Sequence, residues 1–168
     1  IFRLASALRL RGIGGGDKVA FLCPNIPPML EAHYAVPLIG AALVSVNIRL
    51  SPGEVSYIID HSDARIVVVD SEFASLIKPD ELPKVELFVT VCDVNDKMLP
   101  GGVEYESFLE SGQPEPFAFA IDSEDQLLSI NYTSGTTGRP KRSMISISSR
   151  AGSKMRWIRF SSFVRLML

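Results

Sequence analysis

Short apolar runs that alternate with helix-like segments are the strongest constraint on the fold of this 168-residue chain. One of them, RIVVVD at residues 65–70, is apolar at consecutive positions, which is typical of a strand covered on both faces. The predicted strands are 18–23, 42–47, 65–70, 85–91 and 126–134. This alternation predicts an α/β domain with a layered, largely parallel sheet flanked by helices.

Helix signals lie between these runs, at residues 2–13, 24–41 and 51–62. The third segment has the clearest start, because Ser51 is a good N-cap residue and Glu54 follows at the capping-box spacing. Its hydrophobic residues recur at helical intervals, so one face is expected to be buried. We therefore expect helices to connect the first strands of the sheet.

Histidine and cysteine are few and widely spaced. His33 and His61 lie within helix-like segments, and structural roles are expected for both. Cys23 and Cys92 stand in apolar surroundings without the spacing of a metal or redox pair, which predicts buried thiols. The carboxylates are also dispersed, so the sequence predicts neither a metal site nor a pair of acid–base carboxylates.

The composition is that of a globular protein, with 46% hydrophobic and 21% charged residues. The longest apolar run, residues 35–46, is interrupted by Pro37 and Gly40. It is shorter than the roughly 20 residues that a membrane-spanning helix needs. No transmembrane segment is predicted.

One loop contains the candidate binding residues of the chain. The segment TSGTTGRPK at residues 133–141 combines glycines, which permit close approach of backbone amides to an anion, with hydroxyls and cations. A generic turn is the alternative, because Gly, Ser and Thr are common in loops. A Walker loop is excluded by the glycine spacing and by Arg142 after the lysine. The candidate polyphosphate-binding residues are Thr133, Ser134, Gly135, Thr136, Thr137, Gly138 and Lys141.

The sequence INYTSGTTGRPK at residues 130–141 closely resembles the phosphate-loop motif of adenylate-forming (AMP-binding) enzymes. This superfamily includes acyl-coenzyme A synthetases, peptide-synthetase adenylation domains and luciferases. Residues 18–70 are also similar to the N-terminal part of such synthetases, most of all to acyl-activating enzymes for short, medium-chain or aromatic acids. The resemblance extends from residue 1 to residue 141.

The resemblance implies an ATP-dependent carboxylic acid:coenzyme A ligase. In that family a carboxylate attacks the α-phosphorus of Mg-ATP, and coenzyme A then takes the acyl group from the adenylate. The implied cofactors are therefore ATP and Mg²⁺, with coenzyme A as co-substrate and a small carboxylic acid as the partner. Lys141 is the implied catalytic residue, because its charge would stabilise the departing diphosphate.

The composition changes after Lys141. All 19 acidic residues lie before this point, whereas the last 27 residues contain six cations and seven serines. We expect residues 1–141 to be a partial AMP-binding domain and residues 142–168 to be an atypical basic tail outside the family fold. Because the later motifs of the family do not occur, the chain is expected to be an inactive N-terminal fragment.

Two alternatives stay open on the sequence alone. The chain could be a non-catalytic product that binds nucleotide or associates with a full-length paralogue. The basic tail could instead bind a membrane or a nucleic acid, although no nucleic-acid partner is expected. The default location is the cytoplasm, and the family also allows the peroxisome. The last residues, VRLML, match no peroxisomal or reticulum retrieval signal, and any targeting peptide at the start would lie outside this sequence.

Overall fold

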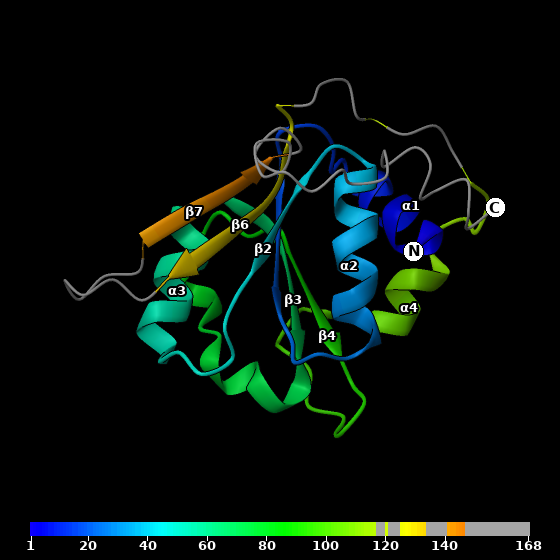
Figure 1. Cartoon of the computed structure of the whole chain (residues 1–168). Coiled ribbons are helices and arrows are strands. Elements are labelled where there is room, and N and C mark those ends of the chain that lie inside the picture. The colour runs from blue at the N-terminus through cyan, green and yellow to red at the C-terminus, as the bar shows by residue number, and fades with distance from the viewer. Residues whose placement is uncertain (117–119, 121–124, 134–140, 147–168) are drawn as a thin grey trace.

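The computed structural model describes residues 1–116, 120, 125–133 and 141–146. Its strands form one seven-stranded sheet in the order β5-β4-β3-β1-β2-β6-β7 (Figure 1). Neighbouring strands are parallel except for the antiparallel pair of β6 and β7. The strands are β1 (Lys18–Leu22), β2 (Ala42–Ser45), β3 (Ala64–Asp70), β4 (Leu87–Val91), β5 (Val103–Glu104), β6 (Leu127–Thr133) and β7 (Lys141–Ser146). The predicted α/β class with a largely parallel sheet is confirmed.

Helices cover both faces of this sheet (Figure 1). The helical elements are α1 (Phe2–Leu10), α2 (Pro27–Leu38), α3 (Pro52–His61) and α4 (Tyr105–Glu110), with 3₁₀ turns η1 (Ser71–Leu76) and η2 (Pro79–Glu81). Residues of α1, α2 and α4 share one buried cluster, whereas α3 and residues near η1 and η2 contribute to another. Within the described part of the chain, none of these helices has the length and apolar character needed to cross a membrane.

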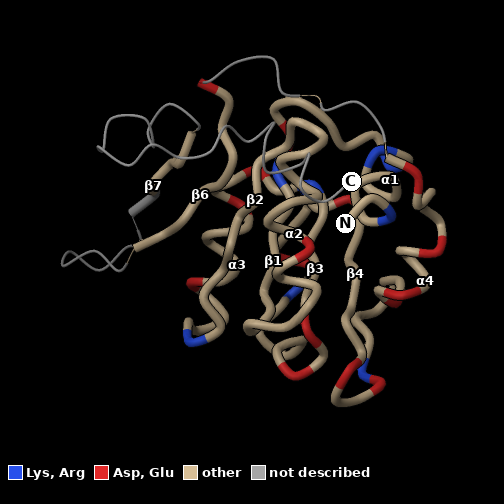
Figure 2. The backbone as a smooth tube through the Cα atoms, turned by 45° about the vertical axis from the view of Figure 1, so that its right-hand side comes forward, with Lys and Arg blue, Asp and Glu red and all other residues tan. Residues whose placement is uncertain are grey.

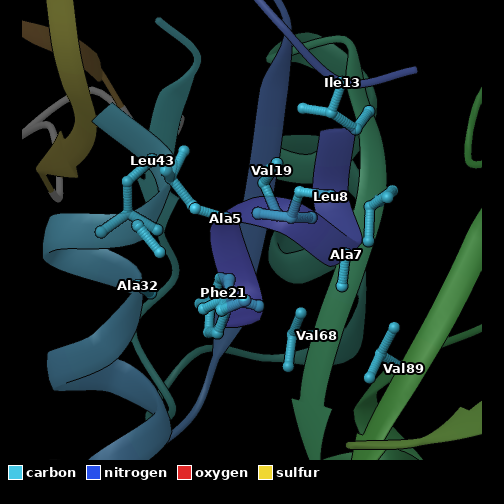
Figure 3. Close-up of a cluster of buried hydrophobic side chains, with 14 of the residues drawn as sticks. Ala5, Ala7, Leu8, Ile13, Val19, Phe21, Ala32, Leu43, Val68 and Val89 are labelled. Carbon is cyan, nitrogen blue, oxygen red and sulfur yellow. The ribbon is translucent and has the colours of Figure 1, made fainter. Parts of the chain in front are cut away.

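The central strand β1 shows why its sequence is apolar without interruption. Val19 and Phe21 point into the cluster under α1 and α2, while Ala20 and Leu22 point into the cluster under α3. All four side chains are fully buried. Figure 3 shows Val19 and Phe21 beside residues of α1 and α2 and beside Val68 of β3. Burial on both faces therefore replaces the polar alternation of a half-exposed strand.

Helix α3 begins as its sequence predicts. Glu54 accepts hydrogen bonds from the backbone N–H of Ser51 at 2.9 Å and from the Ser51 hydroxyl at 2.7 Å. These hydrogen bonds lower the pKa of the Glu54 carboxyl. At the buried face of the helix, Val55, Ile58 and Ile59 lie against the sheet. The predicted capping box and the predicted buried face of this helix are both confirmed.

Other details differ from the sequence-based expectations. The first helix ends at Leu10, and Gly12 takes a φ of 74°, so the chain turns before the following glycines. Cys23 is buried as expected, whereas Cys92 is only partly buried. The strands β5 and β7 were not predicted. Strand β5 has two residues and β7 lies in the serine-rich segment, so neither has a clear apolar pattern.

Candidate functional site

The candidate site lies at the carboxyl edge of the parallel sheet. In open α/β sheets this edge is where ligands bind, because loops diverge there and leave backbone groups accessible. Strand β6 runs parallel to β2 and ends at this edge with Thr133. Strand β7 then returns antiparallel from Lys141, with Lys141 directly opposite Thr133. The glycine-rich segment 134–140 thus connects the two strands of a hairpin.

The structure brings together two of the seven predicted site residues. Thr133 is exposed at the end of β6, and the backbone of Lys141 begins β7 beside it. Residues directly opposite in an antiparallel pair have Cα atoms about 4.5–5.5 Å apart. The predictions for Ser134, Gly135, Thr136, Thr137 and Gly138 fall outside the described residues. Their roles, and that of the Lys141 side chain, stay predictions.

The loop that follows β2 lies next to this hairpin. Strands β2 and β6 are paired with Ser45 opposite Asn131, so the chain beyond Ser45 reaches the same edge as Thr133. Beyond it, the side-chain oxygen of Asn47 accepts a hydrogen bond of 2.9 Å from the backbone N–H of Arg49. This turn contains the exposed Arg49, four residues beyond the end of β2.

Charges of both signs lie in the loops along the carboxyl edge. Figure 2 shows acidic and basic segments in the loop beyond β4, which contains Asp93, Asp96 and Lys97. The loop after β2 contains Arg49, and Glu54 follows in the first turn of α3.

Asp70, at the end of β3, is the most deeply buried carboxylate described. Its side chain is 0% exposed, and its Oδ1 atom accepts a hydrogen bond of 2.8 Å from the backbone N–H of Glu72. Its Oδ2 atom has no hydrogen-bond partner among the described residues. Burial, together with the nearby Asp93 and Glu72 carboxylates, raises the pKa of Asp70. The ionised form therefore destabilises the fold.

We expect Asp70→Asn to raise the free energy of unfolding at pH 7, because the substitution removes a buried charge. The amide retains an oxygen for the Glu72 N–H but carries no charge. Because the folded-state pKa of Asp70 lies above its unfolded value, the wild-type penalty grows as the pH rises from about 4. Denaturant titrations at pH 7 and pH 4 test this, and an equal gain at both values would contradict it.

Cys23, which directly follows β1, is not a nucleophile in this environment. Burial, followed by the charge of Asp70, raises the pKa of its thiol to about 12. The pKa of Cys92 is raised as well, first by burial and then by nearby carboxylates. Since the thiolate is the reactive form, these shifts lower the reactivity of both thiols at neutral pH.

Sequence reasoning missed a pair of residues that connects α3 to the hairpin. Nδ1 of His61 lies 2.9 Å from the hydroxyl oxygen of Tyr132, the residue before Thr133. The ring of Tyr57 stacks on His61 with centroids 5.2 Å apart. His61 and Tyr132 are separated by 71 residues, and no local pattern relates them. Only the pairing of β6 with β2 brings them together.

A divalent cation has no evident protein site in the described ranges. They contain no group of three or more His, Cys, Asp and Glu residues that could hold a metal ion. The hydroxyl, amide and cationic groups at the hairpin suit phosphate oxygens instead.

Comparisons with known proteins place this chain in an enzyme family. The family model for AMP-binding enzymes matches residues 1–162. The chain is 41% identical over 157 residues to the peroxisomal acetate/butyrate–CoA ligase AAE7 of Arabidopsis thaliana, covering 83% of this chain and 27% of the relative. It is 39% identical over 162 residues to the acetate–CoA ligase CCL3 of Humulus lupulus, covering 86% of this chain and 28% of the relative.

The fold is likewise that of a solved ligase. The crystal structure of the anthranilate CoA ligase AuaEII in complex with anthranoyl-AMP superposes with a TM-score of 0.79 at 27% identity. The match covers 86% of this chain and 28% of that enzyme. The chain therefore spans about a quarter of the length of these relatives. With a family model that matches nearly the whole of its length, this chain belongs to the AMP-binding enzyme family.

Proposed function

We propose that the protein to which this chain corresponds is an ATP-dependent carboxylic acid:coenzyme A ligase, and that the hairpin of β6 and β7 binds the polyphosphate of ATP. The observation that supports this most is the pairing of Thr133 with Lys141 across the ends of the segment SGTTGRP, at the carboxyl edge. The sequence similarity to acyl-CoA ligases supports the reaction class.

The proposed reaction has two steps. A carboxylate oxygen of the acid attacks the α-phosphorus of ATP, the bond to the β-phosphate oxygen breaks, and pyrophosphate leaves. The thiol sulfur of coenzyme A then attacks the acyl carbon, loses its proton, and AMP leaves. Mg²⁺, when bound with ATP, would neutralise part of the phosphate charge.

The residues of the hairpin would act on the first step. As the bond to the leaving group breaks, negative charge grows on the departing diphosphate. Preorganised donors aimed at that charge lower the barrier because they need no reorganisation during the reaction. We assign the donor role to the hydroxyls of Thr133, Ser134, Thr136 and Thr137, and the cationic role to Lys141. Gly135 and Gly138 would let backbone amides approach the same oxygens.

Binding by the 168-residue chain tests the assignment. If the hairpin holds phosphates rather than the nucleoside, inorganic tripolyphosphate and ATP should bind with similar affinity, and adenosine should not bind. Isothermal titration calorimetry at low ionic strength measures all three, and added salt should weaken the first two. Binding of adenosine as tight as that of ATP would contradict the assignment, as would no binding of tripolyphosphate.

Turnover is expected to need more than these residues. We propose that the isolated chain is non-catalytic, because it spans about a quarter of the length of the ligases that it resembles. Catalysis depends on holding both reactants in position. An ATP–pyrophosphate exchange assay with a panel of short, medium-chain and aromatic acids should show no exchange. Measurable exchange by the purified chain would contradict the inactive-fragment proposal.

We also propose that the family domain comprises residues 1–141 and that residues 142–168 are a basic tail without a role in phosphate binding. Since β7 extends to Ser146, the matched test is to remove residues 147–168 only. This truncation should leave the affinity for tripolyphosphate within about twofold of the full chain, because surface changes are usually small. A tenfold loss would show that the tail takes part.

The same truncation distinguishes the alternatives. A membrane or nucleic-acid binder that acts through the basic tail should bind anionic vesicles or RNA in a salt-sensitive manner, and lose this binding when residues 147–168 are removed. A product that associates with a full-length paralogue should co-elute with that ligase. For the location we propose the cytoplasm or the peroxisome, and a fluorescent fusion to the complete protein tests it.

A further inference from the structure

We propose that His61 is a positioning residue for the phosphate hairpin, acting through its hydrogen bond to Tyr132. This inference rests on the proposed function for its purpose, although not for its geometry. Nδ1 of His61 and the hydroxyl oxygen of Tyr132 are 2.9 Å apart. Tyr132 directly precedes Thr133, the first of the proposed phosphate-binding residues. A constraint on Tyr132 is therefore also a constraint on the start of the loop.

His61 belongs to a helix that is packed firmly on the sheet. It is the last residue of α3, which is capped at its start and has Val55, Ile58 and Ile59 at 1% exposure or less against the sheet. Its ring stacks on Tyr57, four residues earlier on the same face of the helix, at 5.2 Å and an angle of 27°. Stacking restricts the rotation of the ring and directs its Nδ1 edge.

Tyr132 is held from two directions by this arrangement. Its ring meets His61 edge to face, with centroids 5.9 Å apart and an interplanar angle of 80°. Its hydroxyl shares the hydrogen bond with Nδ1, and its side chain packs beside the cluster under α3. Edge-to-face aromatic pairs contribute about 0.5–1.5 kcal/mol beyond their buried area. The end of β6 is thus fixed by side-chain contacts as well as by the sheet.

This contact matters because the end of β6 is paired on one side only. The pairing with β2 ends at Asn131, whereas the antiparallel pairing with β7 continues through Tyr132 and Thr133. On the side where the parallel ladder has ended, the His61–Tyr132 hydrogen bond attaches the strand to α3. Donors that are held in place before binding lose less entropy when phosphate arrives.

Four variants separate the hydrogen bond from packing. His61→Phe keeps an aromatic ring but loses the hydrogen bond, and Tyr132→Phe loses only the hydroxyl. His61→Asn places a polar atom near the position of Nδ1 and should recover part of the effect. Tyr57→Phe is the matched control, because it removes a hydroxyl from the same aromatic group and retains the stacking.

Amide hydrogen exchange of the unliganded chain is the first test of the role of His61. We expect exchange at residues 131–133 to be about twofold to tenfold faster in His61→Phe and Tyr132→Phe, corresponding to the loss of one hydrogen bond. Tyr57→Phe should match the wild type. Unchanged exchange at these amides in His61→Phe would overturn the inference, whatever the binding results show.

Tripolyphosphate affinity carries the second test. His61→Phe and Tyr132→Phe should each weaken binding by about threefold to tenfold, and the double variant should be no weaker than either single variant. Effects that multiply in the double variant would overturn the inference. If the wild type itself binds no tripolyphosphate while exchange still responds to His61→Phe, the positioning stands and the proposed function is the part that fails.

Discussion

Replacing Lys141 with alanine is expected to weaken the binding of tripolyphosphate and ATP by roughly 10- to 100-fold. A hydrogen bond to a charged group contributes about 1.5–3 kcal/mol, which corresponds to that range. Lys141 begins β7 opposite Thr133, so its substitution changes one end of the proposed site. Titration calorimetry of the wild type and the variant at low ionic strength measures the effect.

Two controls accompany this prediction. Lys18→Ala removes a cation at the start of β1, at the amino-terminal ends of the parallel strands. This substitution should leave the affinity within about twofold. Lys141→Arg keeps the charge but changes the shape of the donor group, so partial affinity is expected. Equal affinities for Lys141→Ala and the wild type would remove the cationic role assigned to this residue.

Replacing Phe21 with alanine is expected to lower the free energy of unfolding by about 3–5 kcal/mol, the usual cost of deleting a buried aromatic ring. Phe21 is 0% exposed in the centre of β1, among side chains from α1, α2 and β3 (Figure 3). Since domains have only about 5–15 kcal/mol of stability in total, the variant should be close to unfolding. Urea titrations followed by circular dichroism measure the loss.

Leu30→Ala is the matched control for this substitution. Leu30 is also a large apolar residue, but it is 61% exposed on α2. Its truncation leaves no cavity, and we expect a change within about 0.5 kcal/mol. If the two variants lost the same free energy, the packing of α1 and α2 on β1 would not be the source of stability described here.

The comparison of sequence and fold shows which information is local. The runs at 18–23, 65–70 and 85–91 were recognisable because strands covered on both faces contain consecutive apolar residues, such as residues 66–69. The order of the strands has no local signal, since it depends on which way each crossover passes over the sheet. The chain places β6 beside β2, although 81 residues (46–126) lie between the end of β2 and the start of β6.

The site shows the same division. Thr133 and the segment that follows could be recognised because glycines, hydroxyls and cations are grouped in nine residues. His61 was expected to be structural, and its contact with Tyr132 could not be foreseen from a separation of 71 residues. The proximity of Asp70 and Asp93 also required the strand order, because these residues become neighbours only through the pairing of β3 with β4.

The central claim is that the hairpin between β6 and β7 binds the polyphosphate of ATP. The most direct measurement is a titration of the isotope-labelled chain with tripolyphosphate, followed by the amide resonances in two-dimensional NMR spectra. We predict saturable shifts of Thr133, Lys141 and the residues between them, with little change at the start of β1. Shifts confined to other parts of the chain, with residues 133–141 unmoved, would contradict the account.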